Sequence, residues 1–317
     1  MTDSNSLRRP VRDITLYQAK GAAESPVCSI VVLAWPPNQA RTNNVFSFLK
    51  SVPKHVLGSA VEVVVVVNGH DPDLSSRLKV ATNVDVLLDP CKNLGVATGW
   101  NLGARYARGE ILVIANEDAL LGPNTLARLI VGASNPTNGF VGVKGEWWTT
   151  RTMRSTRCKS RRKGSAGQDR LILIPFGFLF AVRKTLWDEI GGVDDALSPA
   201  FFEEADLAFR AALRGLKTAV VDDPEVRHES GVSVWNANRI IEWSGGTVSV
   251  TRLHRRNHRH MIEVWSSWKW LGHPVVHCLA YAAYRAVMRS KDRLLSHRGL
   301  ARLGTLAQSS ATDNLPQ

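Results

Sequence analysis

Four runs of apolar residues, separated by stretches with helical character, constrain the fold of this 317-residue chain more than any other feature. The clearest is residues 62–67 (EVVVVV), which is β-branched at five successive positions and ends at the turn-forming pair Asn68 and Gly69. A strand with no polar alternation is buried on both faces, and such strands are typical of parallel sheets that helices cover on both sides. The expected strands are residues 28–33, 62–67, 84–88 and 111–115.

Helical patterns occupy the segments between and after these strands. Residues 45–52 and 95–107 fit helices, and the second is rich in small residues that permit close packing. A third helix begins at Glu203 and ends before Gly215. This order predicts an α/β fold with a Rossmann-like, mostly parallel central sheet and helices on both faces, followed by a helical C-terminal extension.

Polar or turn-forming residues follow each of the four expected strands. Ligands of parallel sheets bind outside the carboxyl ends of the strands, so these residues predict a nucleotide-type site at that edge. The sets are residues 34–35, 68–71, 89–93 and 116–118.

Two groups of acidic residues could carry chemistry at this edge. Glu117 and Asp118 directly follow a strand, where they suit Mg²⁺ or Mn²⁺ bridging a diphosphate, or else form a solvated turn. Glu203, Glu204 and Asp206 open a helix, where one could act as a general base or all three could interact with the helix dipole. These residues alone leave both alternatives open.

Two long motifs in the correct order resemble a known family. Residues 93–118 (NLGVATGWNLGARYARGEILVIANED) resemble the signature of GT-A fold, family 2 glycosyltransferases, closest to the rhamnosyltransferase- and galactofuranosyltransferase-like branch. Residues 176–184 (FGFLFAVRK) and 190–233 are similar to the later motifs of that family, including its acidic helix start and its histidine. The resemblance covers about residues 28 to 235. It implies inverting transfer of a sugar from a dTDP- or UDP-linked donor to a glycan or lipid-linked acceptor, in polysaccharide or cell-envelope synthesis.

The resemblance also implies roles for individual residues. Asp118 matches the last acid of the family's metal motif and His228 the histidine that completes the Mn²⁺ or Mg²⁺ site, while Glu204 matches the base. The implied donor-binding residues are Trp35, Asn68, Asn93, Gly95, Asn101, Asn116 and Glu117. The implied acceptor-binding residues are Trp147, Trp148, Gly177, Glu203 and Asp206. The tryptophan pair fits stacking on a sugar ring and a core position about equally well.

The chain departs from the family pattern at three positions. Val67 stands where the family usually has an acid that recognises the uridine-type nucleobase of the donor. Asn116 opens the metal motif, which leaves only Glu117 and Asp118 as charged residues in it. Glu204 stands at the catalytic-base position, where the family usually has aspartate. A second hypothesis is therefore a catalytically degenerate homologue that binds membrane or nucleic acid through basic patches. A nucleotidyltransferase is disfavoured, because no glycine loop with Lys or Arg follows the first strand.

The net charge of +12 is concentrated in two segments. Residues 151–170 hold eight Lys/Arg against one acid, and residues 252–298 hold ten against two. The first segment is either a solvated loop or a contact for a diphosphate or phosphate-linked lipid. The second also contains several tryptophans, which suit an anionic membrane interface, although a helical pair packing on the catalytic domain is the alternative. Nucleic acid is disfavoured as a partner.

The domain prediction follows from these patterns. We expect a flexible N-terminal arm at 1–26, the GT-A domain at 27–250, a basic, Trp-rich helical extension at 251–298 and a disordered tail at 299–317. No secretory leader is recognisable, no apolar run is long enough to span a bilayer, and the four cysteines form no CxxC pair. The expected location is cytoplasmic, with peripheral binding to the inner face of the membrane.

Overall fold

The computed structural model describes residues 14–19, 25–35, 39–149, 154–156, 171–228 and 240–266. The chain divides into two compact units, Met1–Glu263 and Val264–Gln317, and the fold and site below belong to the first. The helices are α1 (Gln39–Ser51), α2 (Pro72–Lys79), α3 (Val96–Tyr106), α4 (Thr125–Ser134), α5 (Lys184–Ile190), α6 (Glu203–Ala212) and α7 (Val250–Ser266). The strands of the main sheet are β1 (Thr15–Gln18), β2 (Cys28–Ala34), β3 (His55–Val56), β4 (Ser59–Val67), β5 (Val86–Asp89), β6 (Ile111–Asn116), β8 (Asn138–Gly142), β12 (Leu179–Arg183) and β13 (Lys217–Val220). The smaller sheets contain β7 (Ala119–Leu120), β9 (Gly145–Thr149), β10 (Arg154–Thr156), β11 (Leu171–Pro175), β14 (Arg227–His228), β15 (Ile240–Trp243) and β16 (Gly246–Ser249).

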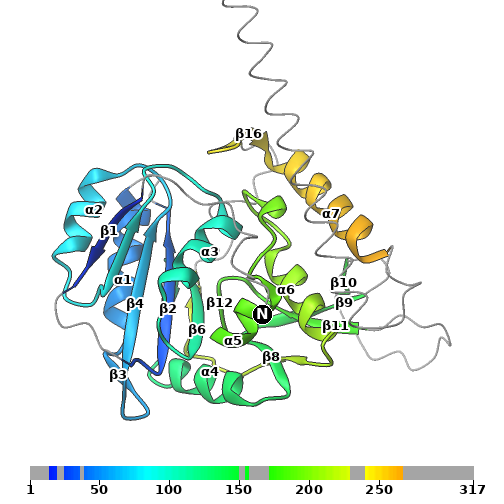
Figure 1. Cartoon of the computed structure of the whole chain (residues 1–317), viewed down its shortest axis with the longest axis horizontal. Coiled ribbons are helices and arrows are strands. Elements are labelled where there is room, and N and C mark those ends of the chain that lie inside the picture. The colour runs from blue at the N-terminus through cyan, green and yellow to red at the C-terminus, as the bar shows by residue number, and fades with distance from the viewer. Residues whose placement is uncertain are drawn as a thin grey trace, which may run out of the picture. The chain divides into compact units, whose positions relative to one another are not determined.

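The main sheet has the strand order β1-β5-β4-β2-β6-β12-β8-β13, with β3 paired to β4 (Figure 1). The four strands predicted from the sequence are β5, β4, β2 and β6, and they are parallel neighbours as expected. Beyond them, β12 is antiparallel to both β6 and β8, and β1 is antiparallel to β5. The sheet is therefore mixed, with its parallel part where the apolar runs predicted it.

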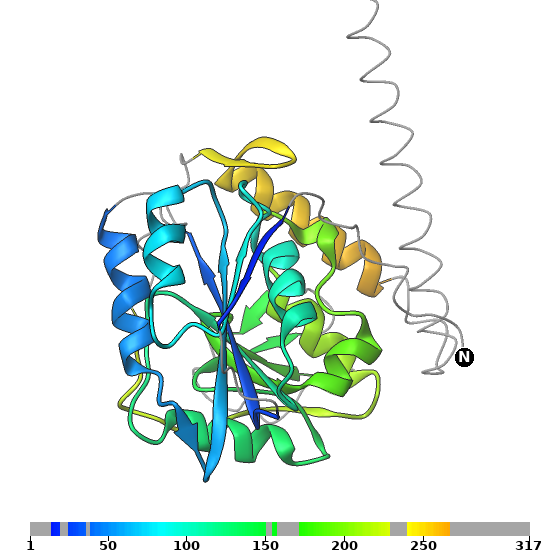
Figure 2. The ribbon, with the colours of Figure 1, turned by 60° about the vertical axis from the view of Figure 1, so that its left-hand side comes forward.

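Helices cover both faces of the parallel strands (Figure 2). On one face, Ile30 and Val32 of β2 join a core with Phe48 of α1 and with residues of α2 and α4. On the other face, α3 lies so close to β2 that a Cβ at Gly103 would come within 2.2 Å of Val31. The small residues predicted to allow close packing do so here.

Two predicted regions lie mostly outside the described residues. Of the basic segment 151–170 the structure describes only 154–156, and of the extension 251–298 it describes only 251–266. Within the predicted flexible arm 1–26, residues 15–18 instead form β1, which pairs antiparallel with β5 in the main sheet. The part of the arm before residue 14 and the tail 299–317 lie outside the described residues, so the other domain limits stay predictions. Across the parts of the chain that are described, no helix combines the length and apolar character needed to cross a membrane.

Candidate active site

An acidic turn follows β6 at the carboxyl edge of the parallel strands. Glu117 and Asp118 are almost completely buried, and one nitrogen of the Arg41 guanidinium lies 3.0 Å from a carboxylate oxygen of each. Arg41 belongs to the first part of α1, which begins close after the carboxyl end of β2, and this places its guanidinium over the acids. The turn is therefore a charged, water-poor site rather than a solvated loop.

His228 completes one side of this turn. Its strand β14 pairs antiparallel with β7, which begins directly after Asp118, so His228 lies opposite Ala119. Its Nε2 atom lies 3.2 Å from Asp118 Oδ1. The ring also stacks on Phe178, with centroids 4.1 Å apart and planes 9° from parallel. The predicted metal residues, 110 positions apart in the sequence, are thus brought together.

The two acids of the turn have different proton affinities. Burial, reinforced by the Asp118 charge, raises the pKa of Glu117 to about 7 despite the neighbouring Arg41. Burial would also raise the pKa of Asp118, but the hydrogen bonds and charges of His228 and Arg41 outweigh it and hold that pKa below its ordinary value. Asp118 is consequently the carboxylate that stays ionised at neutral pH.

The expected donor residues form a connected loop system at the same edge. Asn68 is buried after β4, where its Oδ1 accepts a hydrogen bond of 2.7 Å from the Leu94 amide. Asn93 Oδ1 accepts from the Gly95 amide at 2.9 Å, which fixes the start of α3. A Cβ at Gly95 would come within 2.6 Å of the Pro199 backbone, and its φ of +79° is also one that glycine tolerates best.

Three other expected donor residues differ in their surroundings. Trp35 and Asn116 are partly buried at the carboxyl ends of β2 and β6, as predicted. Asn101 instead faces the 193–195 loop: its amide nitrogen donates to Val193 O at 2.9 Å, and its oxygen accepts from the Val193 amide. Both ends of this amide are used within the protein, so Asn101 supports a loop and the site proposed below does not include it.

The start of α6 holds the second acidic group. Asp206 is buried and pairs with Arg210 one turn later, and Arg210 also donates to Ile190 O, so this pair supports the helix rather than facing an acceptor. Glu203 is also buried, and burial together with the neighbouring Glu204 charge raises its pKa well above the ordinary value. Glu204 is only partly buried, and burial followed by the Glu146 charge raises its pKa to about 7. A base of this kind is half ionised near neutral pH.

The turn between β11 and β12 connects the two acidic groups. A Cβ at Gly177 would lie 3.3 Å from Glu204 Oε2 and 3.3 Å from the Trp100 ring, so this glycine leaves room for the carboxylate. The next residue, Phe178, is the one that stacks on His228. Consecutive residues therefore lie beside the candidate base and the candidate metal ligand.

The tryptophan pair of β9 lies on the Glu204 side. Trp147 is 44% exposed, whereas Trp148 is partly buried and meets Phe202 edge to face at 5.7 Å. The indole of Trp148 donates to Glu146 at 2.8 Å, and Glu146 is the carboxylate that perturbs Glu204. The Trp147 side chain is thus exposed to solvent, whereas Trp148 packs against the loop before α6.

Comparison with known proteins identifies the family of the chain. The sequence profile described as glycosyltransferase like family 2 matches residues 26–241, about two thirds of the chain. The chain belongs to this glycosyltransferase family. No curated protein matches it significantly. Membership makes glycosyl transfer from a nucleotide sugar the reaction class of this family 2 chain.

Two solved structures are similar to this family 2 glycosyltransferase. One is mannosyltransferase PcManGT from Pyrobaculum calidifontis in complex with GDP-Man and Mn²⁺ (18% identity over 90% of this chain and 84% of that one, TM-score 0.49). The other is GalNAc-T7 with UDP, GalNAc and Mn²⁺ (16% identity over 80% of this chain and 49% of that one, TM-score 0.55). The chain thus spans about half the length of GalNAc-T7. The family profile and this second likeness confirm the predicted GT-A fold; the finer branch is not decided by them.

Three residues of the candidate site are not predicted by the sequence patterns. Arg41 has no acidic neighbour in the sequence, although a cation in the helix after the first strand could have been placed at the ligand edge. Glu146 directly precedes the two tryptophans, and no local pattern marks it as part of a site. Phe178 lies within the family motif at 176–184, but its stacking on His228 depends on strand pairing that no local pattern specifies.

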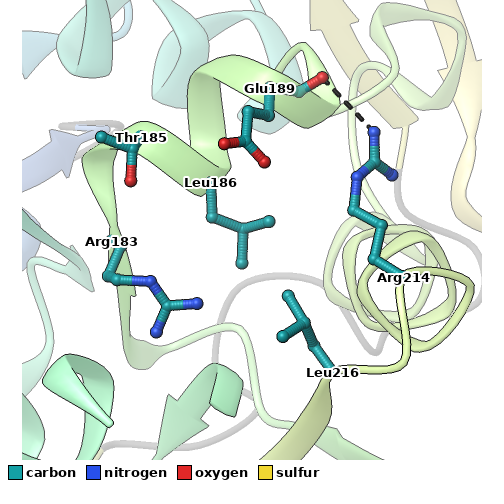
Figure 3. A pocket seen from close by; sticks show the side chains of 6 residues that line it. All are labelled: Arg183, Thr185, Leu186, Glu189, Arg214 and Leu216. Carbon is teal, nitrogen blue, oxygen red and sulfur yellow. Dashed lines mark hydrogen bonds between the residues drawn. The ribbon is translucent and has the colours of Figure 1, made fainter. Parts of the chain in front are cut away.

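A cavity of about 410 Å³ lies away from this site (Figure 3). It is lined partly by Arg183 and Arg214, and Arg183 is at the end of β12, opposite Ile111 at the start of β6. The cavity therefore opens at the sheet edge opposite the acidic turn. The Arg183 guanidinium already donates to the carbonyls of Ala133 and Asn135, so it supports the fold rather than a reaction.

Proposed function

We propose that this family 2 chain is a metal-dependent, inverting glycosyltransferase that transfers a sugar from a dTDP- or UDP-linked donor to a hydroxyl of a glycan or lipid-linked acceptor. The observation that carries the proposal is the turn at Gly177 and Phe178. Phe178 stacks on His228, and Gly177 lies so close to Glu204 that an added Cβ would be 3.3 Å from its Oε2 atom. This turn brings a half-ionised carboxylate and a carboxylate–imidazole pair to the same part of the molecule, as a displacement between two substrates requires.

Asp118 and His228 are the residues that would hold the metal. A carboxylate oxygen and an imidazole nitrogen 3.2 Å apart form a donor set that suits Mn²⁺, and Asp118 is kept ionised for it. Among the described residues, no three His, Cys, Asp or Glu side chains cluster in a way that could hold an ion. The remaining ligands would be diphosphate oxygens and water, which is usual where a metal is bound together with a nucleotide. A bound ion would supply positive charge to the leaving diphosphate.

Glu204 would act as the base. It accepts the proton of the acceptor hydroxyl while that oxygen forms a bond to the anomeric carbon and the bond from that carbon to the diphosphate oxygen breaks. Attack on the face opposite the leaving group inverts the configuration. The exposed ring of Trp147 would stack on the acceptor sugar, and the Gly177 turn keeps the carboxylate accessible.

The finer assignment rests on the sequence and on the charge of α7. The motif at 93–118 supports the rhamnosyltransferase- and galactofuranosyltransferase-like branch and a role in polysaccharide or cell-envelope synthesis. The outer face of α7 exposes Arg252, Arg255 and Arg259, which supports peripheral binding to an anionic membrane where a lipid-linked acceptor would be presented. GalNAc-T7, the more similar fold, was solved with UDP and Mn²⁺, which agrees with the proposed donor class.

A thermal-shift screen of dTDP-, UDP- and GDP-linked sugars, each with and without Mn²⁺, tests the proposal. A true donor raises the melting temperature by mass action, and the increase should require Mn²⁺. The same donor should then lose its sugar in the presence of an acceptor, and product anomers read by NMR should be inverted. If no nucleotide sugar shifts the melting temperature, the chain is a degenerate homologue that binds its partners without chemistry.

A further inference from the structure

Asn257 of α7 is fully buried against the loop that precedes the candidate base. Its side-chain nitrogen lies 2.6 Å from the carbonyl oxygen of Leu197, 2.8 Å from that of Ala200 and 3.2 Å from that of Phe201, and these three acceptors share its two N–H groups. A buried amide aimed at three carbonyls of one loop fixes the path of that backbone, because losing it would leave those acceptors unsatisfied.

The neighbours of Asn257 on α7 contact the same loop. Arg256 donates to the carbonyl of Ser198, and it also orients the Asn257 amide by donating to its oxygen at 2.9 Å. His260 Nε2 lies 3.2 Å from Asp194 Oδ2. The ring of His258 is stacked on Phe202, with centroids 5.7 Å apart. Residues 256–260 therefore hold the loop from Asp194 to Phe202 at several points.

The held loop has a strained backbone at its end. Phe201 and Phe202 have φ values of +82° and +75°, a region that side chains with a Cβ rarely adopt. Two such residues in succession persist only where surrounding contacts over-determine them. Glu203 and Glu204 follow directly, so the direction of the Glu204 side chain depends on this unusual backbone.

The same loop is also connected to the donor side. The Val96 amide donates to Pro199 O at 2.7 Å, and Gly95 leaves no room there for a Cβ. The loop is thus held by α3 on one side and by α7 on the other.

We propose that Asn257 is a positioning residue for the candidate base: it holds the 197–202 loop in the strained conformation that directs the Glu204 carboxylate at the acceptor. This inference rests on the proposed function for its effect on catalysis. It also gives the basic helix α7 a role besides membrane binding, with its inner face serving the active site while its outer face carries the exposed arginines.

The test compares full-length wild type with Asn257→Leu, which keeps most of the side-chain volume but cannot donate. Hydrogen exchange followed by mass spectrometry should show amides of residues 197–206 exchanging roughly 10-fold or more faster, with β2 and β4 unchanged. Turnover with the nucleotide sugar found in the screen should fall by roughly 10²-fold, since a small misplacement of a base costs large factors in rate. The thermal shift given by UDP with Mn²⁺ should stay the same. The matched control is Asn124→Leu, the same change at an exposed residue before α4 whose side chain makes no capping hydrogen bond.

Three results would overturn the inference: unchanged exchange in 197–206, faster exchange throughout the domain together with loss of the UDP shift, or faster local exchange with normal turnover. If Asn257→Leu does not fold, Arg256→Gln replaces it, and the same pattern at smaller amplitude is required. If wild type neither binds UDP or GDP nor turns over, the proposed function fails, while the exchange measurement still decides whether Asn257 holds the loop.

Discussion

The sharpest prediction concerns the pH dependence of turnover and the carboxylate that controls it. Glu204 has a pKa of about 7, raised by burial and by the Glu146 charge. A base must be ionised to accept a proton, so about a tenth of the enzyme is competent at pH 6, half at pH 7 and nine tenths at pH 8. The rate should therefore rise about tenfold from pH 6 to a plateau above pH 8.

Two substitutions separate the base from the group that tunes it. Glu204→Gln keeps the shape but removes basicity, so turnover should fall by roughly 10²-fold at every pH. Glu146→Gln removes a negative charge that disfavours ionisation, so it should move the midpoint of the pH profile to lower pH by roughly half a unit. Glu189→Gln, an exposed acid lining the remote cavity, is the matched control.

The assay is nucleotide diphosphate release measured between pH 5.5 and 9 at saturating donor and acceptor, with donor affinity followed by thermal shift over the same range. A flat profile for wild type, or a midpoint that Glu146→Gln leaves in place, would refute the assignment of the base. Normal turnover in Glu204→Gln combined with a loss in Glu203→Gln or Asp206→Asn would show that the motif has been interpreted in the wrong register.

Three further predictions address the metal, the fold and the membrane. Asp118→Asn should abolish the part of donor affinity that depends on Mn²⁺ while far-UV circular dichroism stays unchanged; donor binding that survives both this substitution and EDTA would contradict the metal assignment. Glu62 is fully buried and pairs with Arg108 at 2.6 Å and with Ser29. Glu62→Ala should therefore lower the free energy of unfolding, measured in urea, by about 3 kcal/mol. Asp73→Ala, which removes one partner of an exposed ion pair, should lower it by less than about 0.5 kcal/mol. Full-length protein should float with phosphatidylglycerol vesicles at low salt and be released at high salt. Reversing the charge of Arg252, Arg255 and Arg259, which are exposed on α7, should reduce flotation, and equal flotation of both proteins would argue against this surface.

The sequence by itself determined the parallel part of the fold and the edge where the site lies. Each run of apolar residues indicates by itself a strand that is buried on both faces, so β2, β4, β5 and β6 could be predicted independently of one another. The acids after β6 and at the start of α6 were found for the same reason, since a strand end or a helix start is a local feature. The family motifs then supplied roles for Asp118, Glu204 and His228.

Only the tertiary structure decided which of these residues act together. The antiparallel insertion of β12 beside β6 places Gly177 and Phe178 between the two acidic groups, and no periodicity specifies that pairing. Arg41 reaches the acids from 76 residues away, and Asn257 reaches the loop before Glu204 from a helix whose sequence indicated a basic surface. Such contacts depend on how separate elements pack. A helix pattern shows that one face is polar and cationic, whereas its inner face acquires a role only when a particular loop lies against it.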